Sequence, residues 1–180
     1  PHLAGAASRL SARRRKAPLN IATPSADPAP RMTGHVIIVG FGPAGQRIAE
    51  ALAEQHGSTI VVVELNPKSA RAARTRGLST YIGDATSLEV LEHLRVGSAH
   101  AVLVTVPDPA TARQVIAGVR SLSPETPVLA RARYHIYRWD LTAAGAEVVI
   151  DEEDEVGRHL ASAALRILRS GQDAGGDKSP

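Results

Sequence analysis

Three glycines in this sequence have the spacing of a phosphate-binding loop. They stand in the run Gly40-Phe41-Gly42-Pro43-Ala44-Gly45, which has the form GxGxxG. The run follows an apolar stretch, Val36–Val39, and opens a segment of helical periodicity over residues 43–56, which is the context this motif requires. There the first glycine permits a tight turn, the second lets the backbone approach a phosphate, and the third lets helix and strand pack closely. The N–H groups and positive dipole end of the helix then attract the anion.

Two carboxylates follow the next two predicted strands. Glu64 comes 19 residues after Gly45, where a carboxylate accepts hydrogen bonds from a ribose diol and repels a 2′-phosphate. The alternative is a tight turn that binds no ligand, with Glu64 solvated. Asp84, in the run Gly83-Asp84-Ala85-Thr86, is placed to accept from an adenine amino group or to hold a cation. Its alternative role is only to help begin the helix that Thr86 caps.

The elements that must position these residues are strands alternating with helices. The predicted strands are Val36–Val39, Thr59–Val63, Thr80–Ile82, Ala101–Val106, Pro127–Ala130 and Glu147–Ile150. Such continuous apolar runs suit strands that are buried on both faces, as in a parallel sheet. The sequence therefore predicts a single α/β domain over residues 34–170, with a doubly wound, Rossmann-like, parallel six-stranded sheet.

Capping residues mark the helix boundaries between these strands. Asn66-Pro67 and Asp108-Pro109 each combine an N-cap residue with proline at the first helical position. Gly77 is placed to close the helix that starts after Asn66. Thr86 and Glu89 have the spacing of a capping box, which predicts that Thr86 caps the next helix.

The two ends of the chain differ from the domain in composition. Residues 1–33 are basic and proline-rich and predict a linker or tether, and residues 171–180 predict a disordered tail. The first 34 residues hold six basic side chains and one acid, a balance of +5; the chain's net charge is +3, so the remainder carries −2. Five aromatic residues and no cysteine argue against a base-stacking nucleic-acid platform and exclude disulfides and thiolate metal sites.

Several of these motifs, taken in order, resemble one known family. They are the glycine loop, Glu64, Gly83–Thr86, Val102–Asp108, Ala130–Arg133 and Ala144–Val149. Together they resemble the RCK N-lobe, the regulator-of-potassium-conductance domain also called TrkA-N, over residues 34–168. The loop variant is most similar to that of domains fused behind Kef-type monovalent cation:proton antiporters.

The resemblance implies that the domain senses a ligand rather than turning one over, with an adenine nucleotide at the glycine loop. By position in the family, Glu64 would hold the ribose, with Leu65 beside it. Asp84 and Ala85 would meet the adenine edge, and Thr105 would border the phosphates.

Two further positions bear on the ligand. Many relatives have an arginine where this chain has Pro43. That arginine serves outer phosphates, so its replacement favours AMP or NAD(H) over ATP. Arg131, at the end of the fifth predicted strand, would contact the second half of the ligand or a partner. Its alternative is a surface salt bridge.

The last predicted helix, residues 152–169, has an apolar face wider than packing on one sheet requires. This face comprises Val156, Leu160, Ala161, Ala163, Ala164, Leu165, Ile167 and Leu168. It predicts a homodimer through this helix, and the alternative is a strongly apolar core helix. The acidic run Asp151–Glu155 complements the helix dipole. A cation site built from Glu155 and His159 is the alternative to that role, and no metal is predicted.

The alternative function is a small NAD-dependent oxidoreductase. A short-chain dehydrogenase needs a Tyr-x-x-x-Lys pair, in which lysine lowers the tyrosine pKa. The nearest approach is Tyr134 with Arg138, and arginine does not do this proton work, so no catalytic residue is predicted. The resemblance instead implies a nucleotide-sensing regulatory domain that gates a potassium or other monovalent cation transporter. Its partner would be a membrane transport domain, at the cytoplasmic face of the cell membrane, with no role for nucleic acid.

Overall fold

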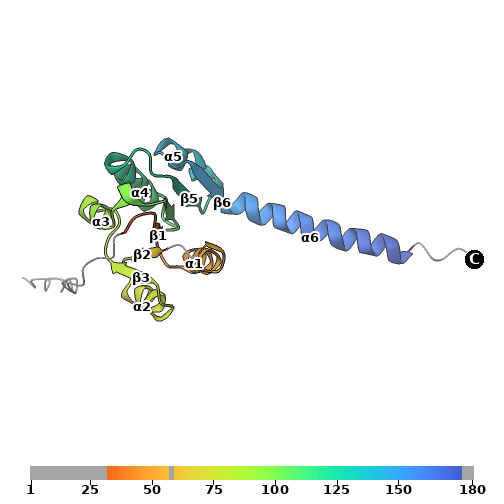
Figure 1. Ribbon diagram of the computed structural model, residues 1–180. Helices are drawn as coiled ribbons and strands as arrows, with labels where there is room; N and C mark the ends of the chain where they lie inside the picture. Colours follow the sequence, from red (N-terminus) through yellow and green to blue (C-terminus); the bar gives the residue numbers. More distant parts are fainter. Residues whose placement is uncertain (1–31, 57–58, 176–180) are drawn as a thin grey trace, which may run out of the picture. The chain divides into compact units, whose positions relative to one another are not determined.

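The computed structural model describes residues 32–56 and 59–175. In this part of the chain six strands form one sheet of order β3-β2-β1-β4-β5-β6, with every neighbouring pair parallel (Figure 1). The strands are β1 (Val36–Val39), β2 (Ile60–Glu64), β3 (Ser79–Ile82), β4 (Ala101–Val104), β5 (Val128–Ala132) and β6 (Val148–Asp151). The predicted Rossmann-like α/β fold is confirmed. The predicted linker, residues 1–33, lies outside the described residues except for its last two.

The helices lie on both faces of the sheet, as a doubly wound fold requires. They are α1 (Pro43–His56), α2 (Pro67–Thr75), α3 (Leu88–His93), α4 (Pro109–Leu122), α5 (Arg138–Ala143) and α6 (Glu152–Gly175), with 3-10 helices η1 (Val96–Ser98) and η2 (His135–Tyr137). Side chains of β1 alternate between the faces. Ile37 and Val39 belong to the core under α3, α4 and α5, whereas Val36 and Ile38 belong to the core under α1 and α2.

The strand order reverses between β1 and β4, and this reversal positions the site. The connection after β1 leads to α1 on one face, and the connection after β4 leads to α4 on the other (Figure 1). The two connections diverge from neighbouring strand ends, and in open α/β sheets ligands bind in the crevice that such a reversal creates. The glycine loop follows β1 and therefore lies at this crevice.

Part of one sheet face carries no helix among the described residues. On the edge strand β6, Val148 and Ile150 are 40% and 49% exposed, while Val149 packs against the core on the other face. Helices α1 and α2 cover the same face only over the first half of the sheet. The uncovered half is an apolar surface beside β5 and β6.

Two of the three predicted helix starts are confirmed. The Asn66 side chain accepts from Lys68 N at 2.9 Å, and that of Asp108 accepts from Thr111 N at 2.8 Å, with proline next in each case. The hydrogen bonds from the Thr111 hydroxyl and N–H lower the pKa of Asp108.

The predicted capping box at Thr86 and Glu89 is wrong. Helix α3 begins at Leu88, after Ser87, whose side chain makes no capping hydrogen bond. Thr86 instead donates twice to Asp84 Oδ1, from its N–H at 2.9 Å and from its hydroxyl at 2.7 Å. An aspartate side chain readily closes such a turn over its own backbone two residues on, and this local bond competes with helix formation.

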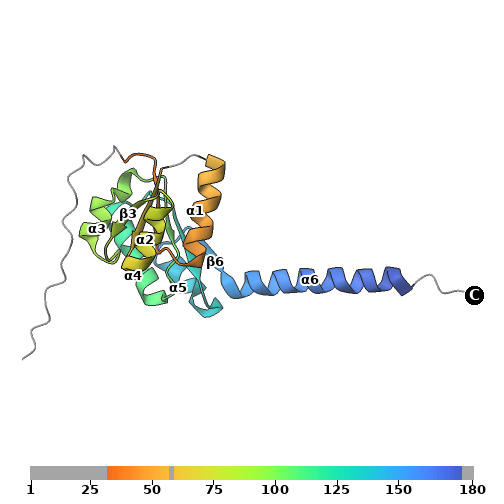
Figure 2. The ribbon, with the colours of Figure 1, turned by 90° about the horizontal axis from the view of Figure 1, so that it is seen from below.

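Helix α6 follows β6 without a connecting loop and leaves the sheet in both views (Figures 1 and 2). It continues to Gly175, so residues 171–175 are helical where the sequence predicts a disordered tail, and residues 176–180 lie outside the described part. Helix propagation adds one hydrogen bond per residue once a helix is nucleated, which accounts for this extension. None of the described helices, α6 included, combines the length and hydropathy that a bilayer crossing needs.

Candidate functional site

The glycine loop has a fixed backbone and an open outer side. Gly40 has φ +93°, in the left-handed region, and its N–H donates to Val63 O at 2.9 Å. A Cβ on Gly45 would lie 2.3 Å from Gly40 O, so only glycine permits this approach of helix and turn. A Cβ on Gly42 would meet nothing within 4 Å. The space beside Gly42 is therefore open to an anion at the start of α1.

Glu64 holds the loop and stays in reach of a ligand. Its Oε2 accepts from Phe41 N at 2.7 Å, and its Oε1 accepts from Asn66 N at 2.7 Å. The side chain is half-buried at the end of β2. Because an ionised carboxylate offers about four acceptor positions, two remain for the hydroxyls of a ribose. Glu64 thus holds the loop in place as well as being a candidate ribose acceptor. The first of these two roles is not evident from the sequence.

Thr105 serves the loop from inside the protein. It is 6% exposed, and its hydroxyl lies 3.0 Å from both Val39 O and Gly40 O. A hydroxyl has one proton, so this donor is committed to the backbone of the loop. Thr105 therefore positions the loop, and its donor is not directed at the phosphates that the sequence expects it to border.

The candidate adenine side lies at the ends of β2 and β3, which are neighbours in register through Glu64 and Ile82. Leu65 is 64% exposed and offers an apolar surface to a ring. Asp84 is exposed, with Oδ1 occupied by Thr86. The Ala85 side chain is buried in the core, so Ala85 can meet a ligand edge only through its backbone. The structure thus gathers these residues at the carboxyl edge of the sheet beside Glu64.

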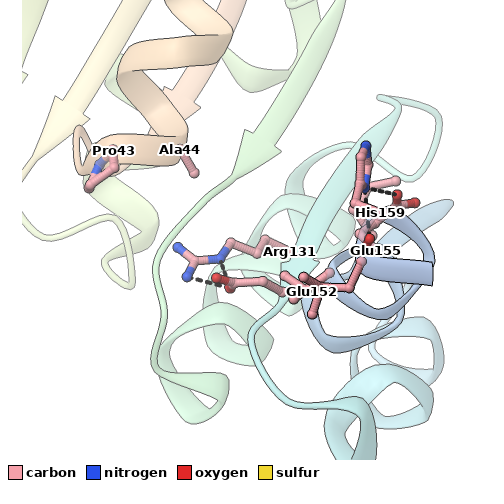
Figure 3. Close-up of a pocket in the computed structure, with 9 residues that line it drawn as sticks. Pro43, Ala44, Arg131, Glu152, Glu155 and His159 are labelled. Carbon is pink, nitrogen blue, oxygen red and sulfur yellow. Dashed lines mark hydrogen bonds and ion pairs between the residues drawn. The ribbon is translucent and has the colours of Figure 1, made fainter. Parts of the chain in front are cut away.

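A cavity of about 650 Å³ lies on the other side of the loop. Its wall is formed by Pro43 and Ala44 at the start of α1, by Arg131 and Ile150 on β5 and β6, and by the first turns of α6 (Figure 3). Within it, Arg131 Nε and Nη2 lie 2.7 and 2.5 Å from Glu152 Oε2. The salt bridge considered for Arg131 is therefore present, and it lines the same cavity as Pro43 and Ala44 of the loop. Sequence reasoning did not find Glu152; the register that pairs Arg131 with Ile150 places Glu152 next to it.

The start of α6 is also hydrogen-bonded to η2. Asp151, 6% exposed, accepts at Oδ1 from the N–H groups of Glu153 and Asp154 at 3.1 and 3.2 Å. Its Oδ2 contacts His135 Nδ1, and His135 N donates to Glu153 Oε2 at 2.8 Å. Burial by itself would raise the pKa of Asp151, but the hydrogen bonds from Asp154, His135 and Glu153 outweigh it and lower that pKa.

The arrangement does not support the alternative cation site. His159 Nδ1 lies 2.7 Å from the carbonyl oxygen of Glu155, to which it must donate, and 3.9 Å from the Glu155 carboxylate. This hydrogen bond occupies Nδ1, so only Nε2 of His159 could bind a metal. Within residues 32–56 and 59–175, no three histidine or carboxylate side chains are grouped as metal ligands.

The sequence matches the family model of the TrkA-N domain over residues 36–152. The chain belongs to the TrkA-N domain family. Among relatives, K(+) efflux antiporter 1, chloroplastic, of Arabidopsis thaliana is 35% identical over 136 residues, which cover 74% of this chain and 11% of that protein. This TrkA-N chain therefore spans only about a tenth of that relative's length.

Solved TrkA-N and RCK structures share the fold. The TrkA-N domain of the inner membrane protein ybaL from Escherichia coli is 26% identical, with a TM-score of 0.70, and the match covers 74% of this chain and 98% of that one. The GsuK channel bound to NAD is 27% identical, with a TM-score of 0.61 and coverage of 72% and 22%. GsuK bound to ADP is 26% identical, with a TM-score of 0.66 and coverage of 72% and 34%. The potassium-transport relatives and the nucleotide-bound neighbours agree with the expected class of protein.

Proposed function

We propose that this TrkA-N domain binds an adenine nucleotide, AMP or NAD(H), at the Gly40–Gly45 loop and regulates a cation:proton antiporter in response. The observation that carries the proposal is the glycine loop itself. It is open at Gly42, closed against the helix at Gly45, and held at Phe41 by the acid that ends β2. Structures of GsuK bound to NAD and to ADP, on the same fold, support an adenine nucleotide as the ligand.

Each part of the nucleotide has a counterpart in the chain. The backbone N–H groups at the start of α1 would bind the phosphate, and Glu64 would accept from the ribose hydroxyls. Leu65 would pack against the adenine ring, whose edge would meet Asp84 and the backbone of Ala85. Pro43 has no positive charge that could pair with an outer phosphate, and this favours AMP or NAD(H) over ATP.

The regulatory role rests on the relatives. K(+) efflux antiporters contain a segment similar to this chain, and the parent protein would supply the membrane transport domain. The domain would lie at the cytoplasmic face of the cell membrane, with residues 1–33 as the basic linker to that domain. Because a ligand shifts an equilibrium only through differential affinity for its states, the nucleotide would act by favouring one arrangement of the assembly.

That assembly would be a homodimer through α6. Its apolar residues are exposed in the single chain, with Leu160 at 66%, Leu165 at 52% and Leu168 at 64%. The alternative of a core helix is therefore wrong for the described chain. The uncovered sheet face at Val148 and Ile150 is a second apolar surface available to another copy.

Thermal unfolding of the chain with AMP, ADP, ATP, NAD, NADH and NADPH tests the proposal. A ligand at 100 times its dissociation constant adds about 2.7 kcal/mol of stability, so AMP or NAD(H) should raise the unfolding temperature. NADPH should raise it less than NADH, because its 2′-phosphate faces Glu64. If none of the six shifts the transition, the nucleotide proposal is wrong.

A second measurement separates this proposal from an oxidoreductase. The domain is incubated with NADH or with ATP while the nicotinamide absorbance and phosphate release are followed. A sensing domain leaves both nucleotides unchanged. Turnover in proportion to protein concentration would restore the enzymatic alternative.

A further inference from the structure

Arg131, on β5, connects the sheet with the first residue of α6. Its Nε and Nη2 atoms hold Glu152 Oε2 at 2.7 and 2.5 Å. The third guanidinium nitrogen, Nη1, makes only a long hydrogen bond, to Thr105 O at 3.4 Å. The Arg131 side chain is 24% exposed and that of Glu152 is 44% exposed, so water screens the pair chiefly from the side of Glu152.

The same guanidinium borders the space that a bound phosphate would approach. Arg131 and Glu152 line one cavity with Pro43 and Ala44, the first residues of α1 (Figure 3). The carbonyl oxygen of Thr105 accepts from Arg131 Nη1. The hydroxyl of Thr105 donates to Gly40 O at 3.0 Å. A continuous series of contacts thus runs from the glycine loop through Thr105 and Arg131 to α6.

The start of α6 is strongly acidic, which determines how it responds to an anion. Glu152 to Glu155 are four consecutive carboxylates. Arg158 pairs with Asp154 at 2.5 Å and with Glu155 at 2.8 Å, whereas Arg131 pairs with Glu152. A phosphate at the start of α1 would therefore be attracted by Arg131 and repelled by Glu152.

We propose that Arg131 is shared between Glu152 and the phosphate group of the nucleotide, so that ligand binding loosens the hold of Arg131 on α6. The inference rests on the proposed nucleotide function and adds the route by which occupancy reaches α6. Arginine suits this role because its planar fork presents five donors in fixed directions. By linkage, whatever frees Arg131 from Glu152 must also strengthen binding of the phosphate.

The test compares two variants that remove the same charge from the same helix. Glu152→Gln removes the charge that holds Arg131, whereas Glu155→Gln removes a cavity-lining carboxylate that pairs with Arg158 instead. Titration calorimetry with AMP and with NAD should show Glu152→Gln binding about three- to tenfold more tightly than the unmodified chain, which is the net effect of one ordinary hydrogen bond. Glu155→Gln should change the affinity less. In an Arg131→Ala background, Glu152→Gln should lose its advantage over Glu155→Gln.

Amide hydrogen exchange in α6 is a second measurement, and a general change in charge would not alter its response to the nucleotide. In the unmodified chain, AMP or NAD should speed amide exchange in the first turn of α6, and in Glu152→Gln the nucleotide should leave that turn unchanged. Equal affinities for Glu152→Gln and Glu155→Gln, or no nucleotide effect on α6, would overturn the sharing of Arg131 while nucleotide binding itself stands. Absence of binding in the unmodified chain would overturn both proposals.

Discussion

The carboxylate of Glu64 accepts a hydrogen bond from Phe41 N at 2.7 Å, although the two residues lie 23 positions apart in the chain. The bond joins the end of β2 to the turn that follows β1. A charge-assisted bond of this kind is about twice as strong as a neutral one, so it restrains the loop before any ligand arrives. The residue expected to recognise the ribose therefore also shapes the loop for the phosphate.

Replacement of Glu64 should consequently weaken nucleotide binding by two routes. Glu64→Ala removes the ribose acceptor and releases Phe41 N, and we expect AMP and NAD affinity to fall by about 1.5–3 kcal/mol, the value of a hydrogen bond to a charged group. Titration calorimetry measures the loss, and Glu54→Ala, an exposed acid of α1, is the control for net charge. Unchanged affinity in a folded Glu64→Ala protein would show that the ribose lies elsewhere.

The same substitution should change the choice between NADH and NADPH. Glu64 repels a 2′-phosphate in the unmodified chain, and Glu64→Ala removes that repulsion. The ratio of the two dissociation constants should therefore move toward one. A ratio equal to that of the unmodified chain would mean that Glu64 does not face the ribose.

Two glycines of the loop should respond differently to a side chain. Gly45→Ala places a Cβ 2.3 Å from Gly40 O, and overpacking of this kind costs about 1–3 kcal/mol of stability. Gly42→Val meets no atom within 4 Å of its Cβ, so the protein should fold normally but lose nucleotide binding. Thermal unfolding and calorimetry on both variants separate the effects. A folded Gly42→Val protein that binds normally would contradict a phosphate at this position.

How much the sequence predicts depends on how local each interaction is. The glycine loop, the proline-started helices and the six strands follow from short motifs and from apolar periodicity, and the structure has them. The capping box at Thr86 is wrong because two local hydrogen-bond patterns compete there, and spacing does not show that Asp84 wins.

Interactions between distant segments are harder to foresee. Pairing of Arg131 with Glu152 depends on the register of β5 with β6, and the contact of His135 with Asp151 depends on where η2 folds over the end of that strand. Short sequence motifs predict neither the register of two strands nor the packing of distant segments. Residue types alone therefore give the carboxylates and the arginine, but not their partners.

Asp151 should make the stability of the domain depend on pH in the acidic range. Despite its burial, its pKa in the folded protein is lowered below the ordinary aspartate value by the hydrogen bonds that its carboxylate accepts. A carboxyl with a lowered folded pKa stabilises the protein above its unfolded pKa, and this contribution disappears as the pH falls through the folded value. We expect Asp151→Asn to be less stable than the unmodified chain at pH 7, with the difference shrinking below about pH 4. Denaturant unfolding of both proteins at pH 7 and below about pH 4 measures this difference in stability. A difference that does not depend on pH would assign the loss to packing.

The apolar face of α6 should hold two copies together. At 100° per residue, Leu160, Leu165 and Leu168 lie on an arc separate from Arg158 and Ser162, and all three leucines are more than half exposed. Light scattering of the unmodified chain should give about twice its mass of 18.9 kDa. Leu165→Glu should yield a monomer or an aggregate, because it places a charge in the contact, whereas Ser162→Glu on the polar side should remain a dimer. A monomeric unmodified chain at high micromolar concentration would refute the pairing through α6.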